Sequence, residues 1–154
     1  MTSLAQARVL VVGCGGLAAT RALVQAGLGA LTLMDDDRVQ ASNLHRQTLF
    51  QAEDEGRLKV EAAAEALRAL RPTLEVTSLA WRLLPTDAAE RIAGHDLVLD
   101  GTDNLASKFL IADAARMAAV PAVHAGVVRW TGWALAAAGQ RGPCMRCVFE
   151  DLPA

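Results

Sequence analysis

The sequence predicts an α/β fold of the Rossmann-like, doubly wound type, with a mainly parallel sheet and helices on both of its faces. Short aliphatic runs alternate with Ala- and Leu-rich segments along the chain, as successive βα units require. A glycine-rich turn, GCGGLA at 13–18, joins the first such run to the first helical segment. Polar residues follow several runs, so ligands are expected at the carboxyl ends of the strands, near the switch point.

The expected elements follow one another without a linker, a repeat or a low-complexity tract. Gly27 and Gly29 end the first helix, and Pro72 stops the second. The expected strands are 8–13, 30–35, 75–79, 96–100 and 122–125, and the expected helices are 17–26, 57–70, 87–93 and 105–118. The segment 127–138 is expected to form a bent pair of antiparallel strands that breaks at Thr131-Gly132.

Length and charge bound the class of protein. The 154 residues suit one domain, 1–154, that buries a core without disulfides. A net charge of −2 points to neither nucleic acid nor a membrane surface as partner. No apolar run approaches the roughly 18 residues of a membrane span, and the N-terminus lacks a signal-peptide pattern. We therefore expect a cytoplasmic protein.

The glycine turn is the first candidate binding site. Gly13, Gly15 and Gly16 let phosphate oxygens approach the backbone, and the following helix offers unpaired N–H groups. Asp35 ends the next strand, where a carboxylate accepts hydrogen bonds from ribose hydroxyls. The pattern indicates an adenine nucleotide without separating NAD from ATP. The alternative is a turn that only packs a helix against a strand.

Polar residues after Asp35 favour ATP. Asn43, Arg46 and Gln47 lie in SNLHRQ, and Lys59 lies at the start of a helix. An amide, a guanidinium and an ammonium beside the phosphates offset the charge that builds up as pyrophosphate leaves. A dehydrogenase has no evident need for them. Each cation, taken singly, also suits a solvated surface position.

The fourth strand ends in DGTDN, at 100–104. An acid at this edge, facing a triphosphate, is well placed to hold Mg²⁺. Asp103 is the expected metal ligand, while Asp100 is expected to orient backbone N–H groups of the turn. Asp103 or Asn104 also suits the N-cap of the next helix, which is compatible with metal binding if different residues serve the two roles.

Five further side chains have structural interpretations. Cys14 is expected to be packed inside the glycine turn, and Trp81 in the core. Trp130 and Trp133 are expected to be core or interface aromatics. His124 ends a strand near the site and has no evident partner in the sequence.

The motifs GCGGLA, LMDDDRVQASNLHRQ, GRLKVEAAAEAL, LDGTDN and GPCMRC, in this order, resemble the ThiF/MoeB-like adenylyltransferases, relatives of the ubiquitin-activating enzymes. The similarity runs from about Arg8 to Leu152. It implies that a ubiquitin-like sulfur carrier's C-terminal glycine carboxylate attacks the α-phosphorus of ATP, giving an acyl-adenylate and pyrophosphate. It also implies a homodimer. The implied roles are ribose binding by Asp35, Mg²⁺ binding by Asp103 and phosphate binding by Gly15, Gly16, Asn43, Arg46 and Lys59.

The chain departs from the family pattern at three points. Ala18 replaces a usual glycine, which the dinucleotide fingerprint tolerates. The N-terminal helical segment and the C-terminal half, with its second Cys-x-x-Cys, are expected to be missing. Cys144 and Cys147 then make half of a tetrahedral zinc site. They are a half-site completed by another chain, a relic of a lost or truncated site, or a redox pair, and we expect no zinc on them.

Three functions therefore remain open from the sequence. The favoured one is an ATP-dependent adenylyltransferase. The second is a truncated, non-catalytic module of the same fold that binds a nucleotide or a partner. The third, an NAD(P)-dependent oxidoreductase, is supported only by the glycine turn and Asp35.

Overall fold

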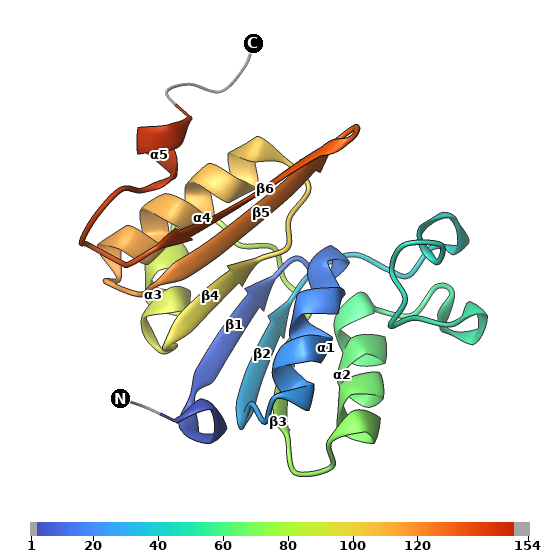
Figure 1. Ribbon diagram of the computed structural model, residues 1–154. Helices are drawn as coiled ribbons and strands as arrows, with labels where there is room; N and C mark the ends of the chain where they lie inside the picture. The colour runs from blue at the N-terminus through green and yellow to red at the C-terminus, as the bar shows by residue number, and fades with distance from the viewer. Residues whose placement is uncertain (1–2, 150–154) are drawn as a thin grey trace.

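A six-stranded sheet forms the centre of the computed structural model, which describes residues 3–149 (Figure 1). The ends of the predicted domain, 1–2 and 150–154, lie outside the described residues. The strands are β1 Arg8–Val12, β2 Ala30–Met34, β3 Glu75–Leu79, β4 Leu97–Asp100, β5 Ala122–Val128 and β6 Thr131–Ala137. Their order is β3-β2-β1-β4-β5-β6, and only β6 pairs with its neighbour in the antiparallel sense. The predicted Rossmann-like fold is confirmed.

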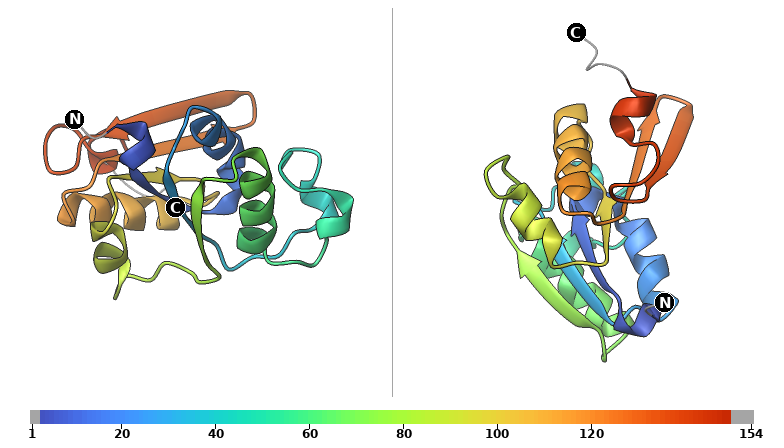
Figure 2. Two further views of the ribbon diagram at one scale, coloured as in Figure 1. Left: turned by 90° about the horizontal axis from the view of Figure 1, so that it is seen from below. Right: turned by 90° about the vertical axis from the view of Figure 1, so that its left-hand side faces the viewer.

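Helices cover both faces of this sheet (Figure 2). The helices are α1 Leu17–Gln25, α2 Lys59–Leu70, α3 Ala88–Ala93, α4 Leu105–Met117 and α5 Met145–Val148. Short 3₁₀ turns occur at Leu4–Gln6, Cys14–Gly16, Ala41–Asn43 and Ala52–Asp54. Within residues 3–149, no helix has the length and apolar character that crossing a membrane requires.

The side chains of β1 show how the two layers form. Because successive side chains of a strand point to opposite faces, Val9 and Val11 belong to one core cluster, with residues of α1 and α2. Leu10 and Val12 belong to the other cluster, with residues of α3 and α4. A strand buried on both faces reads as a continuous apolar run, as RVLVV does.

The C-terminal hairpin differs from the prediction. β5 continues to Val128, and the chain reverses at Arg129 and Trp130 instead of breaking at Thr131-Gly132. Arg129 has a φ of 55°, in the left-handed region that tight turns use. Gly126 pairs with Trp133, and a Cβ at Gly126 would lie only 2.7 Å from the indole ring. This glycine–tryptophan pair fixes the register, so Thr131-Gly132 lies inside β6.

The tryptophans also separate into two groups. The prediction that Trp81 lies in the core is wrong, because its side chain is 54% exposed in the loop after β3. There the Arg91 guanidinium stacks 4.4 Å from the ring centroid. Trp130 is fully exposed at the hairpin tip, which excludes the core and leaves the predicted interface role. Trp133 is half-buried, with its ring 4.9 Å from that of Phe149.

The ends of β1 and β4 meet in direct backbone contact at the point where the strand order reverses. Gly101 N–H donates to the Val12 carbonyl at 2.8 Å. Gly13 has a φ of +85°, and a Cβ there would lie 2.8 Å from both Gly101 C and Thr102 N. Only glycine fits both constraints, so the glycine turn and the DGTDN turn form one unit.

Replacement of Gly13 by alanine should destabilise the fold more than the same change at Gly56. Gly56 has a similar φ of +82°, but a Cβ there meets nothing within 4 Å. Gly56→Ala should cost about 1–2 kcal/mol for the left-handed backbone, and Gly13→Ala about 1–3 kcal/mol more for the clash. Urea unfolding of the two variants measures the difference. Equal losses of unfolding free energy would show that a Cβ at Gly13 does not clash with the backbone of the DGTDN turn.

Candidate functional site

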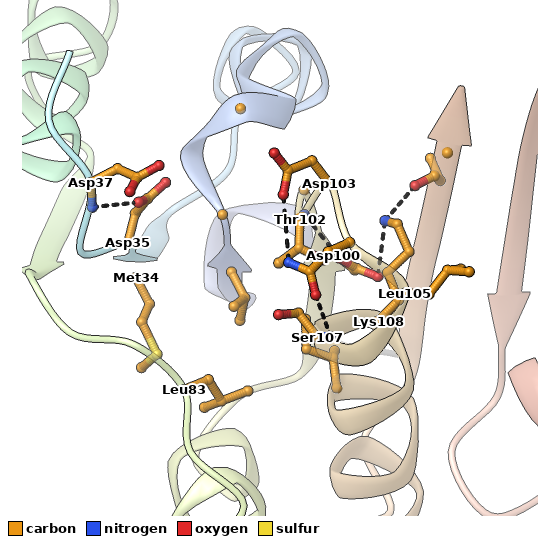
Figure 3. Close-up of a pocket in the computed structure, with 18 of the residues that line it drawn as sticks. Met34, Asp35, Asp37, Leu83, Asp100, Thr102, Asp103, Leu105, Ser107 and Lys108 are labelled. Carbon is orange, nitrogen blue, oxygen red and sulfur yellow. Dashed lines mark hydrogen bonds and ion pairs between the residues drawn. The ribbon is translucent and has the colours of Figure 1, made fainter. Parts of the chain in front are cut away.

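A cavity of about 610 Å³ lies along the carboxyl ends of the strands, at the predicted switch point (Figure 3). Figure 3 shows Asp35 and Asp37 on one side of it and Asp103 on the other, with the end of β1 between them. Its volume falls in the range of small-molecule and cofactor sites. Its wall includes these predicted site residues: Gly13, Gly15, Asp35, Arg46, Gln47, Lys59, Asp100 and Asp103.

Asp35 links the glycine turn to the loop after β2. One oxygen of its carboxylate accepts the Cys14 N–H at 2.6 Å, and the other accepts the Asp37 N–H at 2.8 Å. Each carboxylate oxygen keeps lone-pair capacity for a ligand hydroxyl. Cys14 is fully buried, as predicted. Burial, reinforced by Asp35 and Asp37, raises the pKa of its thiol, so Cys14 stays protonated and packs as an apolar group.

The two predicted cations are held in different ways. Lys59 begins α2 with its side chain only 7% exposed, and its Nζ lies 2.8 Å from Asp37 Oδ2. Arg46 is exposed, and its Nη2 donates to Asn43 Oδ1 at 2.6 Å. Asn43 does not line the cavity, so in this structure its side chain orients the guanidinium of Arg46.

Gln47 lies on the cavity wall as a buried amide. Within residues 3–149, its Oε1 has no hydrogen-bond partner. Its Nε2 lies beside Gly15, at 3.5 Å from the position of an added Cβ. A buried polar group without a partner is costly unless a ligand or water completes it. Gln47 therefore adds an amide to the set of groups that face the glycine turn.

The DGTDN turn divides its roles among three residues. Asp100 Oδ1 accepts the Thr102 N–H at 3.0 Å and its hydroxyl at 2.6 Å, which confirms that Asp100 orients the turn. Asn104 is the N-cap of α4, since its Oδ1 accepts the Ser107 N–H at 2.9 Å. Asp103 lies exposed between them, 3.5 Å from Asn104 Nδ2. In the described part of the chain no cationic side chain pairs with Asp103.

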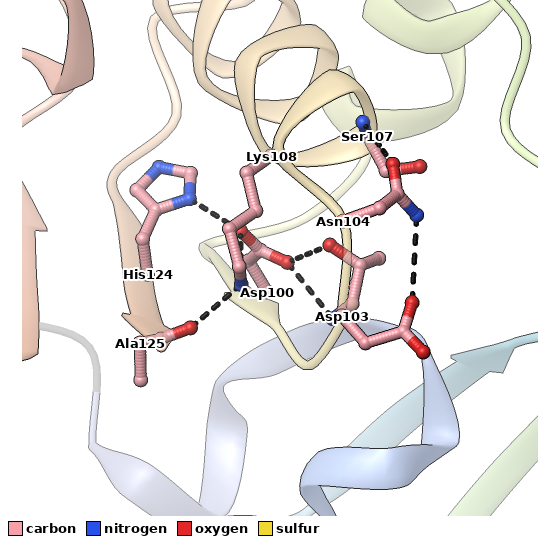
Figure 4. Close-up of polar contacts among 8 residues, drawn as sticks. Asp100, Asp103, Asn104, Ser107, Lys108, His124 and Ala125 are labelled. Atoms are coloured by element: carbon pink, nitrogen blue, oxygen red, sulfur yellow. Dashed lines mark hydrogen bonds and ion pairs between the residues drawn. The ribbon is translucent and has the colours of Figure 1, made fainter. Parts of the chain in front are cut away.

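Sequence reasoning missed two partners of Asp100 (Figure 4). Lys108 Nζ lies 3.3 Å from Asp100 Oδ2 and donates to the Ala125 carbonyl at 2.6 Å. His124 Nδ1 lies 2.8 Å from the same Oδ2. The sequence did contain a signal, because Lys108 and His124 lie in segments that are expected to be largely buried. Buried polar groups require partners, so each of them predicts a hydrogen-bond or ion-pair partner.

The electrostatics of Asp100 reflect these contacts. Burial pushes the pKa of its carboxyl upward. Hydrogen bonds from His124 and Thr102, with the charge of Lys108, outweigh that effect and hold the pKa below its ordinary value. Asp100 is therefore a buried carboxylate that stays ionised at neutral pH.

Cys144 and Cys147 lie outside this cavity, Cys144 at the N-cap of α5 and Cys147 within that helix. Their Sγ atoms are 3.5 Å apart. Arg146, between them, donates to both oxygens of Asp113 on α4, at 2.8 and 2.6 Å. These two bonds anchor the segment 144–147 to α4. Among residues 3–149, no further His, Cys, Asp or Glu joins the two thiols in a metal-sized group. The absence of zinc remains a prediction.

Comparison with known proteins identifies the family of the chain. The ThiF family model matches residues 1–154. The adenylyltransferase and sulfurtransferase UBA4 of Yarrowia lipolytica is 43% identical over 148 residues, 95% of this chain and 37% of the relative. The SAMP-activating enzyme E1 of Haloferax volcanii is 38% identical over 152 residues, 97% of this chain and 56% of the relative. This chain thus spans about a third to a half of these relatives.

Solved structures show the same relationship. The crystal structure of Escherichia coli MccB with ATP has a TM-score of 0.86 and 25% identity, over 94% of this chain and 45% of MccB. The fold, the motifs at the strand ends and the family match over all 154 residues agree. The chain belongs to the ThiF family, related to the ubiquitin-activating enzymes, as its motifs predict.

Proposed function

We propose that this chain forms the ATP-binding centre of a cytoplasmic adenylyltransferase that activates the C-terminal glycine carboxylate of a ubiquitin-like sulfur-carrier protein. One observation carries the proposal: the cavity at the switch point combines the glycine turn with Lys59, Arg46 and Asp103 on its wall. A dinucleotide site needs the turn and a ribose-binding acid, whereas cations and a further acid suit a metal-bound triphosphate. The names of the two relatives and the ATP complex of MccB support the same function.

Each part of ATP has a matching part of the cavity. Met34 and Leu83 give one end an apolar wall suited to a base (Figure 3). Asp35, next to Met34, accepts ribose hydroxyls. Gly15 and Gly16 lie where the backbone turns into α1, and they cradle the phosphates.

The reaction follows from positioning and charge. A carboxylate oxygen of the carrier attacks the α-phosphorus, the bond from that phosphorus to the bridging oxygen breaks, and pyrophosphate leaves with the electron pair. Lys59 and Arg46 stabilise the charge on the departing phosphates, and Gln47 Nε2 donates to a phosphate oxygen. Asp37 and Asn43 already hold the two cations, so little reorganisation is needed. No side chain acts as a covalent nucleophile.

Mg²⁺ suits the donor set around Asp103. Magnesium is usually held by one or two carboxylates together with substrate phosphates and retained waters. Asp103 offers an exposed carboxylate at the cavity wall. The group of Asp35, Asp36 and Asp37 also brings oxygens within 4.8 Å of one another. It is the weaker candidate, because backbone N–H groups occupy Asp35 and Lys59 pairs with Asp37. A bound ion neutralises phosphate charge.

The proposed assembly is a homodimer that receives the carrier. Val127, Val128 and Trp130 expose apolar side chains together at the β5–β6 hairpin, and two of them adjoin the cavity. Exposed apolar groups of this kind mark interaction surfaces. Cys144 and Cys147 offer only two of the four donors that a structural zinc site needs, so zinc binding would require two donors from outside the described residues.

Mg-ATP should bind more tightly than NAD. In a metal-bound triphosphate the two cations and Asp103 all have partners. NAD has only the two phosphates that link its nucleosides, so it offers these side chains fewer charged partners. Isothermal calorimetry with and without Mg²⁺ measures both affinities. NAD binding that equals or exceeds Mg-ATP binding would overturn the adenylyltransferase proposal.

Asp103→Asn should remove the Mg²⁺ dependence of ATP binding, because the amide keeps the shape of the side chain but loses the charge. The matched control is Asp36→Asn, another exposed acid that lines the cavity. It should keep the Mg²⁺ dependence. ATP titrations at several Mg²⁺ concentrations compare the two variants. If Asp36→Asn, and not Asp103→Asn, loses the dependence, then the metal lies on the acidic group after β2.

A further inference from the structure

Asp100, Lys108 and His124 form a buried polar network next to the turn that carries Asp103, built around the Asp100–Lys108 ion pair (Figure 4). Their side chains are 0%, 5% and 0% exposed. They come from three elements, β4, α4 and β5. Ionised groups are costly to bury, and removing one partner of a buried pair costs more than the pair contributes. These three groups are therefore strongly dependent on one another.

The carboxylate of Asp100 has an inner and an outer oxygen. The inner oxygen, Oδ2, is shared by His124 Nδ1 at 2.8 Å and Lys108 Nζ at 3.3 Å. The outer oxygen, Oδ1, holds the backbone N–H and the hydroxyl of Thr102. The contact with His124 is the shorter of the two inner contacts. On the inner side, the rotation of the carboxylate, and so the direction of Oδ1, is therefore constrained mainly by His124.

His124 has a defined tautomer in this network. Nδ1 faces a carboxylate oxygen, so it must carry a proton and donate. Within residues 3–149, Nε2 is buried without a hydrogen-bond partner. The ring is therefore oriented by its bond to Asp100, and its other nitrogen makes no competing contact in the described part of the chain. A histidine used only to fill space would not need this arrangement.

The network reaches Asp103 through the backbone. Thr102, immediately before Asp103, is held by Asp100. Asn104, immediately after it, is held by its capping bond to Ser107. Asp103 therefore lies between two residues whose positions are fixed by hydrogen bonds. Loss of the contact between Asp100 and Thr102 would leave only Asn104 fixed.

We infer that His124, acting through Asp100, is a positioning residue that sets the direction of the Asp103 carboxylate toward the metal of bound nucleotide. This inference rests on the proposed function, in which Asp103 holds Mg²⁺. His124 contacts neither the metal nor the nucleotide in this account. Lys108 supports the same carboxylate and ties it to the Ala125 carbonyl on β5.

The test compares His124→Leu with His124→Asn. Leucine removes the donor, whereas the Asn amide nitrogen replaces Nδ1. Loss of a residue that is hydrogen-bonded directly to a metal ligand costs roughly ten- to hundredfold in metal affinity, and His124 acts more remotely, through Asp100 and Thr102, so we expect the lower end of that range. His124→Leu should raise the Mg²⁺ concentration for half-maximal ATP binding by roughly tenfold. His124→Asn should restore it to within roughly threefold of the wild type, since the hydrogen bond is regained. ATP binding in EDTA serves as the internal reference and should change little in either variant.

His95→Leu is the matched control. His95 is half-buried and contacts Thr32 Oγ1 at 3.0 Å. It precedes β4, so it lies at the amino end of that strand, whereas the cavity lies at the carboxyl ends. This variant should keep the wild-type Mg²⁺ dependence. If His124→Leu also keeps it, or if His124→Asn fails to restore it, His124 does not position the turn.

Two further measurements keep the inference testable. If His124→Leu does not fold, Thr102→Val removes the 2.6 Å hydroxyl contact and leaves the inner network intact. It should shift the Mg²⁺ dependence in the same direction, and an unchanged dependence would overturn the inference.

¹⁵N NMR of the wild-type histidines should show a protonated His124 Nδ1 without any nucleotide. An unprotonated Nδ1 would contradict the network itself. Wild-type ATP binding without Mg²⁺ dependence would instead refute the proposed function.

Discussion

The close approach of the Gly13 backbone to Gly101 and Thr102 is the constraint on which the site depends. It brings together residues that lie almost ninety positions apart in the chain. β1 and β4 are neighbours at the point where the strand order reverses, so the chain leaves them toward opposite faces of the sheet. A crevice opens between the two connections. Asp35 completes the arrangement, because its carboxylate binds the Cys14 N–H and fixes the glycine turn to the end of β2.

Charge pairing explains which groups remain for a ligand. Lys108 is buried against Asp100, whereas Lys59 pairs with the largely exposed carboxylate of Asp37 and still lines the cavity. Asp103 has no cationic partner within the described residues, while Arg46 is exposed on the wall and oriented by Asn43. A triphosphate brings several negative charges, which the protein cations only partly offset. A divalent ion on Asp103 supplies the remaining positive charge.

Much of this fold could be predicted because it depends on local patterns. The buried strands and the helix limits follow from apolar periodicity and from glycine and proline. The orienting role of Asp100 and the capping role of Asn104 follow from short-range turn chemistry. The hairpin reversal at Arg129 and Trp130 did not, because the pairing of Gly126 with Trp133 sets it.

Tertiary contacts explain the wrong prediction for Trp81 and the two partners of Asp100 that the sequence did not reveal. Trp81 reads as a core residue by type, yet Arg91 holds it at the surface. His124 and Lys108 meet Asp100 only because β4, β5 and α4 pack together, which no local spacing reveals. The assigned contacts of Asn43, Arg46, Lys59 and Asp103 with nucleotide remain predictions.

Exchange of labelled pyrophosphate into ATP tests the proposed adenylyltransferase chemistry most directly. The reaction runs only when a carboxylate is activated reversibly as its adenylate, so it reports the proposed bond-breaking step itself. The protein should catalyse exchange when a ubiquitin-like carrier ending in Gly-Gly is present, and a carrier lacking the terminal glycine should not support it. Binding of Mg-ATP with no exchange for any such carrier would contradict the account, because it would make this centre a nucleotide-binding module without adenylyltransferase chemistry.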